Sequence, residues 1–199
     1  MGFLKDYCYF LRLRDMQGEP LYKFSCGNDD LDEFFHKDYL PYEDELMGKS
    51  YCYGIKENDS FRIVAAFTVS NHSIRNRLLS SGAKKLLQEN VSQEKRNIDF
   101  PAVLIGRIGV DVEFQDKHIG SELMDFIKAW FVDSDNKTGC RFILVDAYNN
   151  PATINYYKAN GFRYLFNNID SEKKYRKLEG VEGDLHTRTM IFDLYPIKR

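Results

Sequence analysis

The chain has 199 residues, of which 43% are hydrophobic and 29% are charged, and its formal net charge at pH 7 is −2. This length and composition suit one globular domain with a sizeable core, so we expect a single domain over residues 1–199. A net charge so close to zero excludes a chain that binds nucleic acid or membranes through its overall charge, although a local basic patch stays compatible with it.

The four cysteines stand singly, without a Cys-x-x-Cys pair, and the four histidines do not lie beside them at zinc-ligand spacing. We therefore expect no metal site. No N-terminal apolar run resembles a signal peptide, and no stretch approaches the ~18 apolar residues of a membrane span. These features favour a cytoplasmic protein.

The first elements alternate strand and helix. The segment YCYFLRL, residues 7–13, alternates apolar side chains with others and predicts a strand. In SCGNDDLDEFF, capping residues precede an acidic first turn and apolar side chains at helical spacing. This pattern predicts a helix over residues 29–39 that ends before Pro41.

Two antiparallel strands come next, at residues 50–56 and 62–70. The turn-forming sequence ENDS, residues 57–60, separates them. Residues 74–90 combine leucines at helical spacing with basic residues, which predicts one or two surface helices.

The second half of the chain also alternates. We predict strands at residues 101–112, 140–148 and 187–195, helices at 120–132 and 151–160, and an exposed loop or long hairpin at 167–186. The helix at 151–160 has a cap candidate in Asn150 and a left-handed stop at Asn160-Gly161. Strands that alternate with helices indicate a mixed sheet with helices on both faces.

Two motifs stand out in this half, VDVEFQDKHIGSELM and NNPATINYYKANGF. The first resembles an acyl-CoA-binding loop, Gln/Arg-x-x-Gly-x-Gly/Ala after a strand that ends in Val-Asp. The second resembles the signature Asn-x-x-Ala followed by Tyr-x-x-x-Gly-Phe. Both signatures are those of the GNAT superfamily of N-acetyltransferases, which the chain therefore resembles. The resemblance implies an α/β (α+β) fold. Its sheet is mixed and mostly antiparallel, with six to seven strands, helices on both faces and a splayed central pair of strands.

The resemblance also implies acetyl-CoA as co-substrate and indicates where it binds. Backbone N–H groups at a helix start attract anions, and in this family such a loop wraps the pyrophosphate. The expected cofactor-binding residues are Ile108, Gly109, Val110, Gln115, Asp116, Lys117, His118, Ile119, Gly120, Ser121 and Asn149.

Three of these residues carry further expectations. Gly109 fits a β-bulge or the close approach of a ligand. His118 stands where the family has its first glycine. We expect it to hold a negative φ and donate to a phosphate; the alternative is a distorted loop that binds the cofactor weakly or not at all. Asn149 either contacts the pantetheine arm or its loop, or caps the next helix.

Two residues are the candidate catalytic groups. Tyr157 matches the family tyrosine that protonates the departing CoA thiolate, a task that suits a phenol which is neutral at pH 7. The family's usual glutamate base is missing, because Leu144 occupies its place. Asp146 lies two residues on, faces the same side of the strand and is the first substitute, with Asp111 and Glu113 next.

The acceptor substrate is open among three functions. The leading one is acetyl transfer to a primary amine of a small molecule or protein. FSCGNDDLDEFF and LIGRIGVD are also similar to segments of bacterial toxins that acetylate aminoacyl-tRNA. The third is a non-catalytic acyl-CoA-binding domain, which His118 and the missing glutamate would favour.

Charge bears on the choice between the first two functions. The acidic residues 29–33 and the net charge disfavour tRNA, because binding to nucleic acid needs neutralised phosphates. A local basic patch could still form from Lys84, Lys85, Lys95, Arg96 and the run KKYRK at 173–177. A homodimer through strand edges is also compatible with the sequence.

Overall fold

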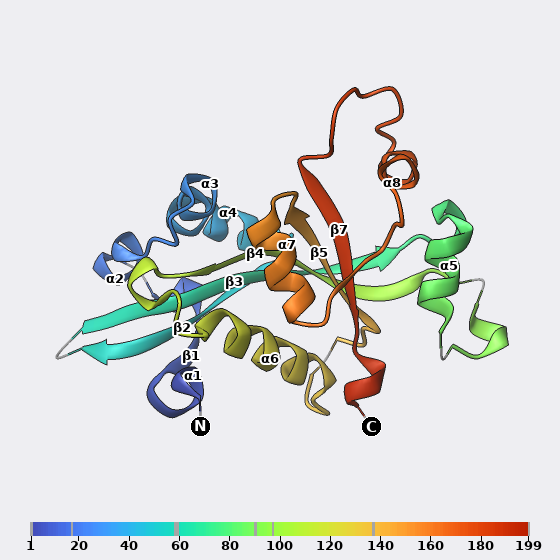
Figure 1. The fold of residues 1–199 in the computed structure, drawn as a ribbon. Coiled ribbons are helices and arrows are strands. Elements are labelled where there is room, and N and C mark those ends of the chain that lie inside the picture. The colour runs from blue at the N-terminus through green and yellow to red at the C-terminus, as the bar shows by residue number, and fades with distance from the viewer. Residues whose placement is uncertain are drawn as a thin grey trace. The chain divides into compact units, whose positions relative to one another are not determined.

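The computed structural model describes residues 2–16, 18–57, 60–89, 91–96, 98–136 and 138–198. Figure 1 shows the helices and strands of the chain, coloured by residue number. The chain forms two compact units. Unit 1 comprises Met1–Asn71 and Ile105–Trp130, and unit 2 comprises His72–Leu104 and Phe131–Arg199. The long strands β3 (Ser60–Ile74) and β4 (Phe100–Val110) contribute residues to both units. The prediction of a single domain stays a prediction.

Unit 1 contains strands in the order β1-β2-β3-β4. Its other elements are α1 (Phe3–Tyr7), β1 (Tyr9–Arg12), α2 (Glu19–Lys23), α3 (Asp29–Glu33), α4 (Tyr39–Asp44), β2 (Lys49–Glu57) and α6 (Ile119–Val132) as far as Trp130. β2 pairs antiparallel with β3, as predicted, and it also pairs antiparallel with β1. The turn predicted at residues 57–60 includes residues 58–59, which lie outside the described residues.

An apolar core holds unit 1 together and fixes the start of α6. Phe35, Cys52 and Ile63 are almost fully buried in one cluster. The Phe10 ring of β1 lies 4.7 Å from that of Phe126 and 5.4 Å from that of Trp130, centre to centre, both on α6. Burial of these large rings stabilises the packing of α6 on the strands, so the loop before α6 starts from a fixed point.

The first predicted helix is longer than expected. A π-helical turn, Phe34–Asp38, joins α3 to α4, and the helical run continues through Pro41 to Asp44. In this wide turn the N–H of Tyr39 donates to the carbonyl of Phe34. An α-helix pairs each N–H with the carbonyl four residues earlier, and a proline disrupts this pairing. The π turn has already broken it before Pro41, so the predicted end of the helix before Pro41 is wrong.

Unit 2 contains strands in the order β4-β5-β7-β6. Its own elements are α5 (Ser81–Gln88), β5 (Phe142–Tyr148), α7 (Pro151–Ala159), β6 (Arg163–Tyr164), α8 (Ile169–Arg176) and β7 (Thr187–Asp193). β7 pairs antiparallel with β5 and β6. Leu87, Phe142, Phe166 and Ile191 belong to its core.

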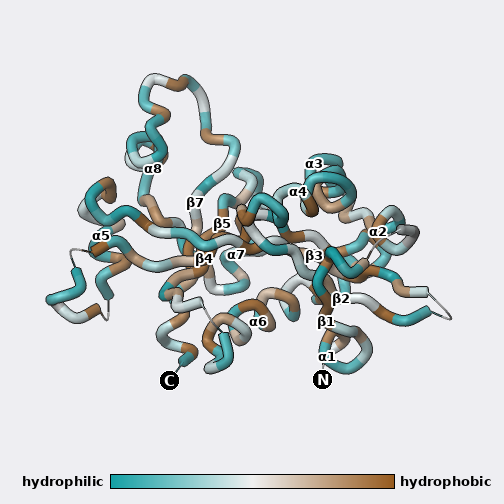
Figure 2. Tube along the Cα trace, turned by 180° about the vertical axis from the view of Figure 1, so that it is seen from behind, coloured by the Kyte–Doolittle hydropathy of each residue, from teal (hydrophilic) through white to brown (hydrophobic). Residues whose placement is uncertain are grey.

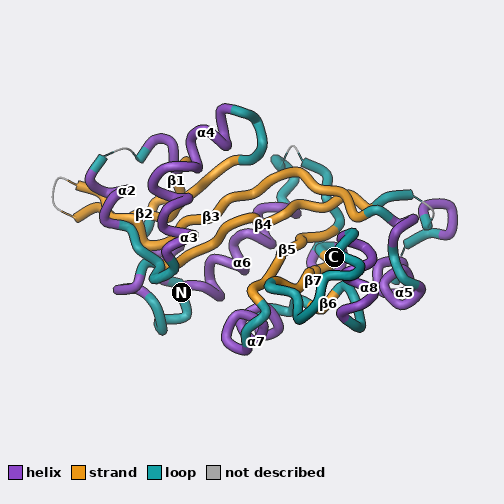
Figure 3. The backbone as a smooth tube through the Cα atoms, turned by 90° about the horizontal axis from the view of Figure 1, so that it is seen from above, coloured by secondary structure: helices purple, strands orange, loops and turns teal. Residues whose placement is uncertain are grey.

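Short 3-10 helices complete the described structure, at Leu13–Asp15, Asn76–Leu78, Gln93–Lys95, Val112–Phe114 and Tyr195–Ile197. Figure 3 shows β3 and β4 as long neighbouring strands. No helix in the described part of the chain is both long and apolar enough to cross a membrane.

Two helices lie where the sequence predicted other structure. α8 lies inside the segment predicted as a loop or hairpin, and α1 overlaps the start of the first predicted strand. α8 is teal in Figure 2, because its residues are mostly hydrophilic. It begins at a cap in which the Asn168 side chain accepts the Ser171 N–H at 2.8 Å. The hydrophobic pattern gave no sign of it because its anchoring contacts are polar.

Candidate active site

The loop between β4 and α6 holds two non-glycine residues in the left-handed region, Asp116 with φ 58° and His118 with φ 61°. The carbonyl of His118 accepts the N–H groups of Ser121 and Glu122, each at 3.1 Å, and so begins α6. The predicted negative φ of His118 is therefore wrong. An L-residue costs about 1–2 kcal/mol in this conformation, which glycine adopts freely. His118 keeps the backbone shape that suits a glycine.

Side chains of the loop fix it to its own unit. Nε2 of Gln115 donates to the carbonyls of Cys26 and Val110, both at 2.9 Å. Nζ of Lys117 donates to the carbonyl of Glu113 at 2.8 Å. The amide of Gln115 therefore acts as an internal clamp on the loop.

A buried carboxylate anchors the strand end before the loop. Asp111 is 2% exposed and accepts from Arg62 at 3.1 Å, from the Ser25 N–H at 3.3 Å and from the Glu113 N–H at 3.1 Å. Arg62 also pairs with Glu113 at 2.8 Å, and this contact lowers the pKa of Glu113. Both alternative bases are thus paired with Arg62; Asp111 is buried, whereas Glu113 remains largely exposed.

Gly109 lies in a close contact made by the protein itself. A Cβ at this position would stand 2.8 Å from Cβ of Cys26 and 3.0 Å from its Sγ. The neighbouring Ile108 and Val110 are partly buried, and Ile119 at the start of α6 is 2% exposed. The close approach predicted at Gly109 is therefore made by the segment around Cys26, and its role toward a cofactor stays a prediction.

Tyr157 of α7 is 6% exposed in unit 2. Its ring lies 5.3 Å from that of Phe162, and its carbonyl accepts the Phe162 N–H at 3.0 Å. Burial raises the pKa of Tyr157. The phenol consequently keeps its proton at neutral pH, as a general acid requires.

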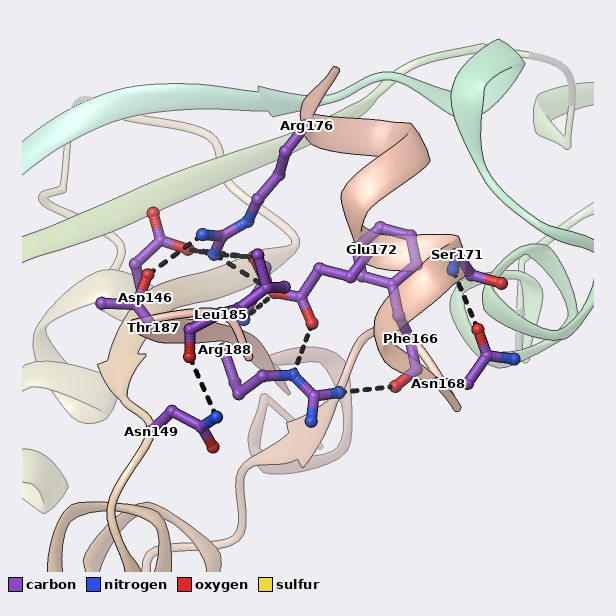
Figure 4. A network of polar contacts seen from close by, with 11 residues as sticks. Asp146, Asn149, Phe166, Asn168, Ser171, Glu172, Arg176, Leu185, Thr187 and Arg188 are labelled. Carbon is purple, nitrogen blue, oxygen red and sulfur yellow. Dashed lines mark hydrogen bonds and ion pairs between the residues drawn. The ribbon is translucent and has the colours of Figure 1, made fainter. Parts of the chain in front are cut away.

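Asp146 of β5 belongs to a network of polar contacts under α8 (Figure 4). Its Oδ1 accepts from the Arg176 guanidinium and from the Thr189 hydroxyl, the latter at 2.9 Å. The Asp146 side chain is 48% exposed. This carboxylate is oriented from one side by Arg176 and remains open to solvent.

Glu172 is the buried centre of the same network. It is 0% exposed and accepts from Nε of Arg188 at 2.7 Å, from the Thr189 N–H at 2.6 Å and from Arg176 at 3.2 Å. Figure 4 shows the side chains of Glu172, Arg176 and Arg188 pointing toward one another. A buried carboxylate needs such charged and hydrogen-bonding partners, so this contact fixes α8 against β7.

Asn149 follows β5 and holds the segment before β7. Its side-chain amide donates to the carbonyl of Leu185 at 2.9 Å, and its N–H donates to the carbonyl of His186 at 2.8 Å. The cap of α7 is Asn150, whose Oδ1 accepts the Thr153 N–H at 2.9 Å. The helix-capping alternative for Asn149 is therefore wrong.

The motif-bearing part of the chain matches a known family model. Residues 83–164 match the model described as "Acetyltransferase (GNAT) domain". The match covers less than half of the chain. The resemblance stated from the sequence is confirmed, and so is the acetyltransferase class. No curated protein matches the chain significantly.

Solved structures similar to this chain include several toxins. A Tyr-to-Phe mutant of KacT has a TM-score of 0.69 and 16% identity, and the match covers 97% of this chain and 98% of that one. AtaTR bound with AcCoA has a TM-score of 0.67 and 16% identity, and the match covers 97% of each chain. AtaT complexed with acetyl-methionyl-tRNAfMet has a TM-score of 0.64 and 16% identity, and the match covers 96% of this chain and 97% of that one. At these identities the likeness concerns the fold, and it confirms the predicted fold class.

The structure groups the predicted site residues by unit. Ile108 to Val110 and Gln115 to Ser121 lie along one strand end and loop of unit 1, and Asp146, Asn149 and Tyr157 lie in unit 2. The sequence reasoning missed Arg176 and Glu172, which hold Asp146 and α8. The available signals were the Asn168 cap and the four-residue spacing of Glu172 and Arg176, typical of a helical ion pair.

Proposed function

We propose that this chain is an acetyl-CoA-dependent N-acetyltransferase that acts on a primary amine of a small molecule or protein. The observation that carries the proposal is the loop before α6. It keeps glycine-like backbone geometry at His118 although a histidine stands there. Retention of a costly conformation in a family binding loop supports a functional loop, and it weakens the alternative of a distorted one.

The loop residues fit the pyrophosphate of acetyl-CoA. α6 has 14 residues, so its dipole places a substantial partial positive charge at Ile119 and Gly120. The Lys117 ammonium lies in the same loop and adds a full positive charge. Gly120 has no side chain and Ser121 has a small one, so a diphosphate could approach this helix start closely, and these residues would bind and orient it.

The catalytic groups would act on the acetyl transfer as follows. Acetyl-CoA supplies the acetyl group as a thioester. Asp146, directly or through a water, would take a proton from the acceptor amine, and Tyr157 would donate its proton to the departing thiolate sulfur. The contacts of Asp146 with Arg176 and Thr189 leave its second oxygen available for this task.

A second candidate acceptor is the amino group of aminoacyl-tRNA. The observation that favours it is the similarity, over nearly the whole chain, to AtaT complexed with acetyl-methionyl-tRNAfMet. The exposed lysines of α8 and its C-terminal end, Lys174 and Lys177, offer positive charge, although the chain has a net charge of −2. A cytoplasmic location would suit either acceptor, and a homodimer stays a prediction.

Calorimetric titration with acetyl-CoA tests the proposal. We expect saturable binding to the wild type, retained in Gly120→Ala and lost in Gly120→Glu, whose side chain would block the loop with bulk and negative charge. No binding to the wild type at millimolar acetyl-CoA would refute the proposal.

Turnover then separates the candidate functions. Small amines, a protein substrate and aminoacyl-tRNA would be assayed with the wild type and with Tyr157→Phe. The Tyr157→Phe variant should bind acetyl-CoA normally while kcat falls by about 10²–10⁴-fold, the usual contribution of a general acid. Binding without turnover of any acceptor would favour the non-catalytic acyl-CoA-binding domain.

A further inference from the structure

Arg107 of β4 lacks a carboxylate partner. Five other arginines in the described ranges are also partly or fully buried, and each of them pairs with Asp or Glu: Arg14, Arg62, Arg141, Arg176 and Arg188. Arg107 makes no ion pair with any described residue. A partly buried guanidinium without a counterion is costly, so its presence calls for an explanation.

The contacts of Arg107 leave part of its donor set unused. Its guanidinium carbon lies 4.9 Å from the centre of the Phe34 ring, and Nη1 donates to the carbonyl of Gly106 at 2.9 Å. Nε is buried and has no acceptor among the described residues. Buried donors in native proteins are nearly always paired, and an exception often marks a place where a ligand or an ion is bound.

The immediate surroundings offer a platform for a ligand. Phe34 is the first residue of the π-helical turn, and such turns are frequent at functional sites. Stacking on Phe34 keeps the guanidinium flat, so its planar fork is already arranged for a bidentate partner.

Two acidic residues of helix α3, Asp32 and Glu33, have partners of their own. The Asp32 carboxylate accepts from the Ser25 hydroxyl at 2.6 Å and from the Cys26 N–H at 2.7 Å. Glu33 pairs with Lys37 at 3.1 Å. Since these carboxylates are engaged, the positive charge of Arg107 stays available for an external anion.

We propose that Arg107, stacked on Phe34 and without a carboxylate partner among the described residues, binds an oxyanion of the acceptor molecule, a carboxylate or a phosphate. A guanidinium fork matches the two oxygens of either group. This inference rests on the proposed acetyl transfer only in assigning the anion to the acceptor. It makes Arg107 a specificity-determining residue that favours amines carrying a nearby negative charge over neutral ones.

Arginine Nε–H resonances in a ¹⁵N-edited NMR spectrum test the proposal directly. The Arg107 signal is assigned by its loss in Arg107→Lys, and the protein is titrated with inorganic phosphate and with acetate at constant ionic strength. We expect a saturable shift of the Arg107 signal with at least one anion, while the paired Arg62 and Arg141 stay unmoved. Phosphate alone or acetate alone would identify the kind of oxyanion.

Two results would overturn the proposal. One is an Arg107 signal that moves with neither anion, and the other is an equal shift with chloride, which would mean general charge screening. As a matched pair of amines, O-phosphoethanolamine should shift the signal and ethanolamine should not. Equal shifts with both amines would refute the recognition of the acceptor's anion.

Calorimetry with acetyl-CoA keeps this inference separate from the proposed function. Arg107→Lys should bind acetyl-CoA within about twofold of the wild type, because the anion site is not the pyrophosphate loop. If neither protein binds acetyl-CoA while the Arg107 signal still moves with oxyanions, the proposed function fails and the anion site stands. If both bind acetyl-CoA and the signal does not move, the anion site fails alone.

Discussion

Replacement of His118 by glycine should stabilise the protein. The exposed His118 holds φ 61°, which costs an L-residue about 1–2 kcal/mol and costs glycine nothing. Glycine gains more backbone freedom in the unfolded chain, and this offsets about 0.5–1 kcal/mol of the gain. The net expectation for His118→Gly is a rise of about 0.5–1 kcal/mol in the free energy of unfolding.

Urea denaturation measures this change. With an m-value of about 2 kcal/mol per M, the midpoint of the transition that reports on unit 1 should rise by about 0.3–0.5 M. His118→Ala is the matched control, because alanine also loses the imidazole but keeps the left-handed penalty. If the glycine variant unfolds at the same urea concentration as the alanine variant or below it, the strain assigned to His118 is absent.

Two further predictions concern charged groups. Glu172→Gln leaves buried Arg188 without its carboxylate and should lower the free energy of unfolding by about 3 kcal/mol. The control Glu179→Gln, at an exposed position, should change it by less than about 0.5 kcal/mol. A loss below about 1 kcal/mol for Glu172→Gln would contradict the network. Arg62 lowers the pKa of Glu113, so this pair stabilises the fold above the ordinary carboxyl pKa and the effect disappears as pH falls through the lowered value. NMR titration should give a higher Glu113 midpoint in Arg62→Gln than in the wild type. Equal midpoints would show that Arg62 does not lower the pKa of Glu113.

Local signals in the sequence predicted the second half of the chain well. The Asn150 cap and the left-handed Gly161, with φ 82°, bound α7 as expected, because both depend on interactions within a few residues. The strand, loop and helix around His118 also follow the predicted order. These elements lie in the stretch whose motifs indicated the family.

Features that depend on contacts distant in sequence could not be predicted. α8 is polar and owes its place to Glu172, which meets Arg188 on a strand 16 residues away. The helix through Pro41 depends on a π turn that no pattern in the sequence marks. The position of Cys26 against Gly109 joins residues more than eighty positions apart in the sequence, so a glycine that suggested a ligand turned out to accommodate a side chain.

The Glu172 carboxylate has a consequence for solubility. β6 spans only two residues, opposite Ile191 and Met190 of β7, and beyond it the Thr189 N–H is taken by Glu172 at 2.6 Å. A side chain thus occupies a backbone donor on which another chain could add a strand, and exposed strand edges promote aggregation. When α8 detaches, this edge becomes available to other molecules, so the first sign of damage in unit 2 would be self-association rather than unfolding.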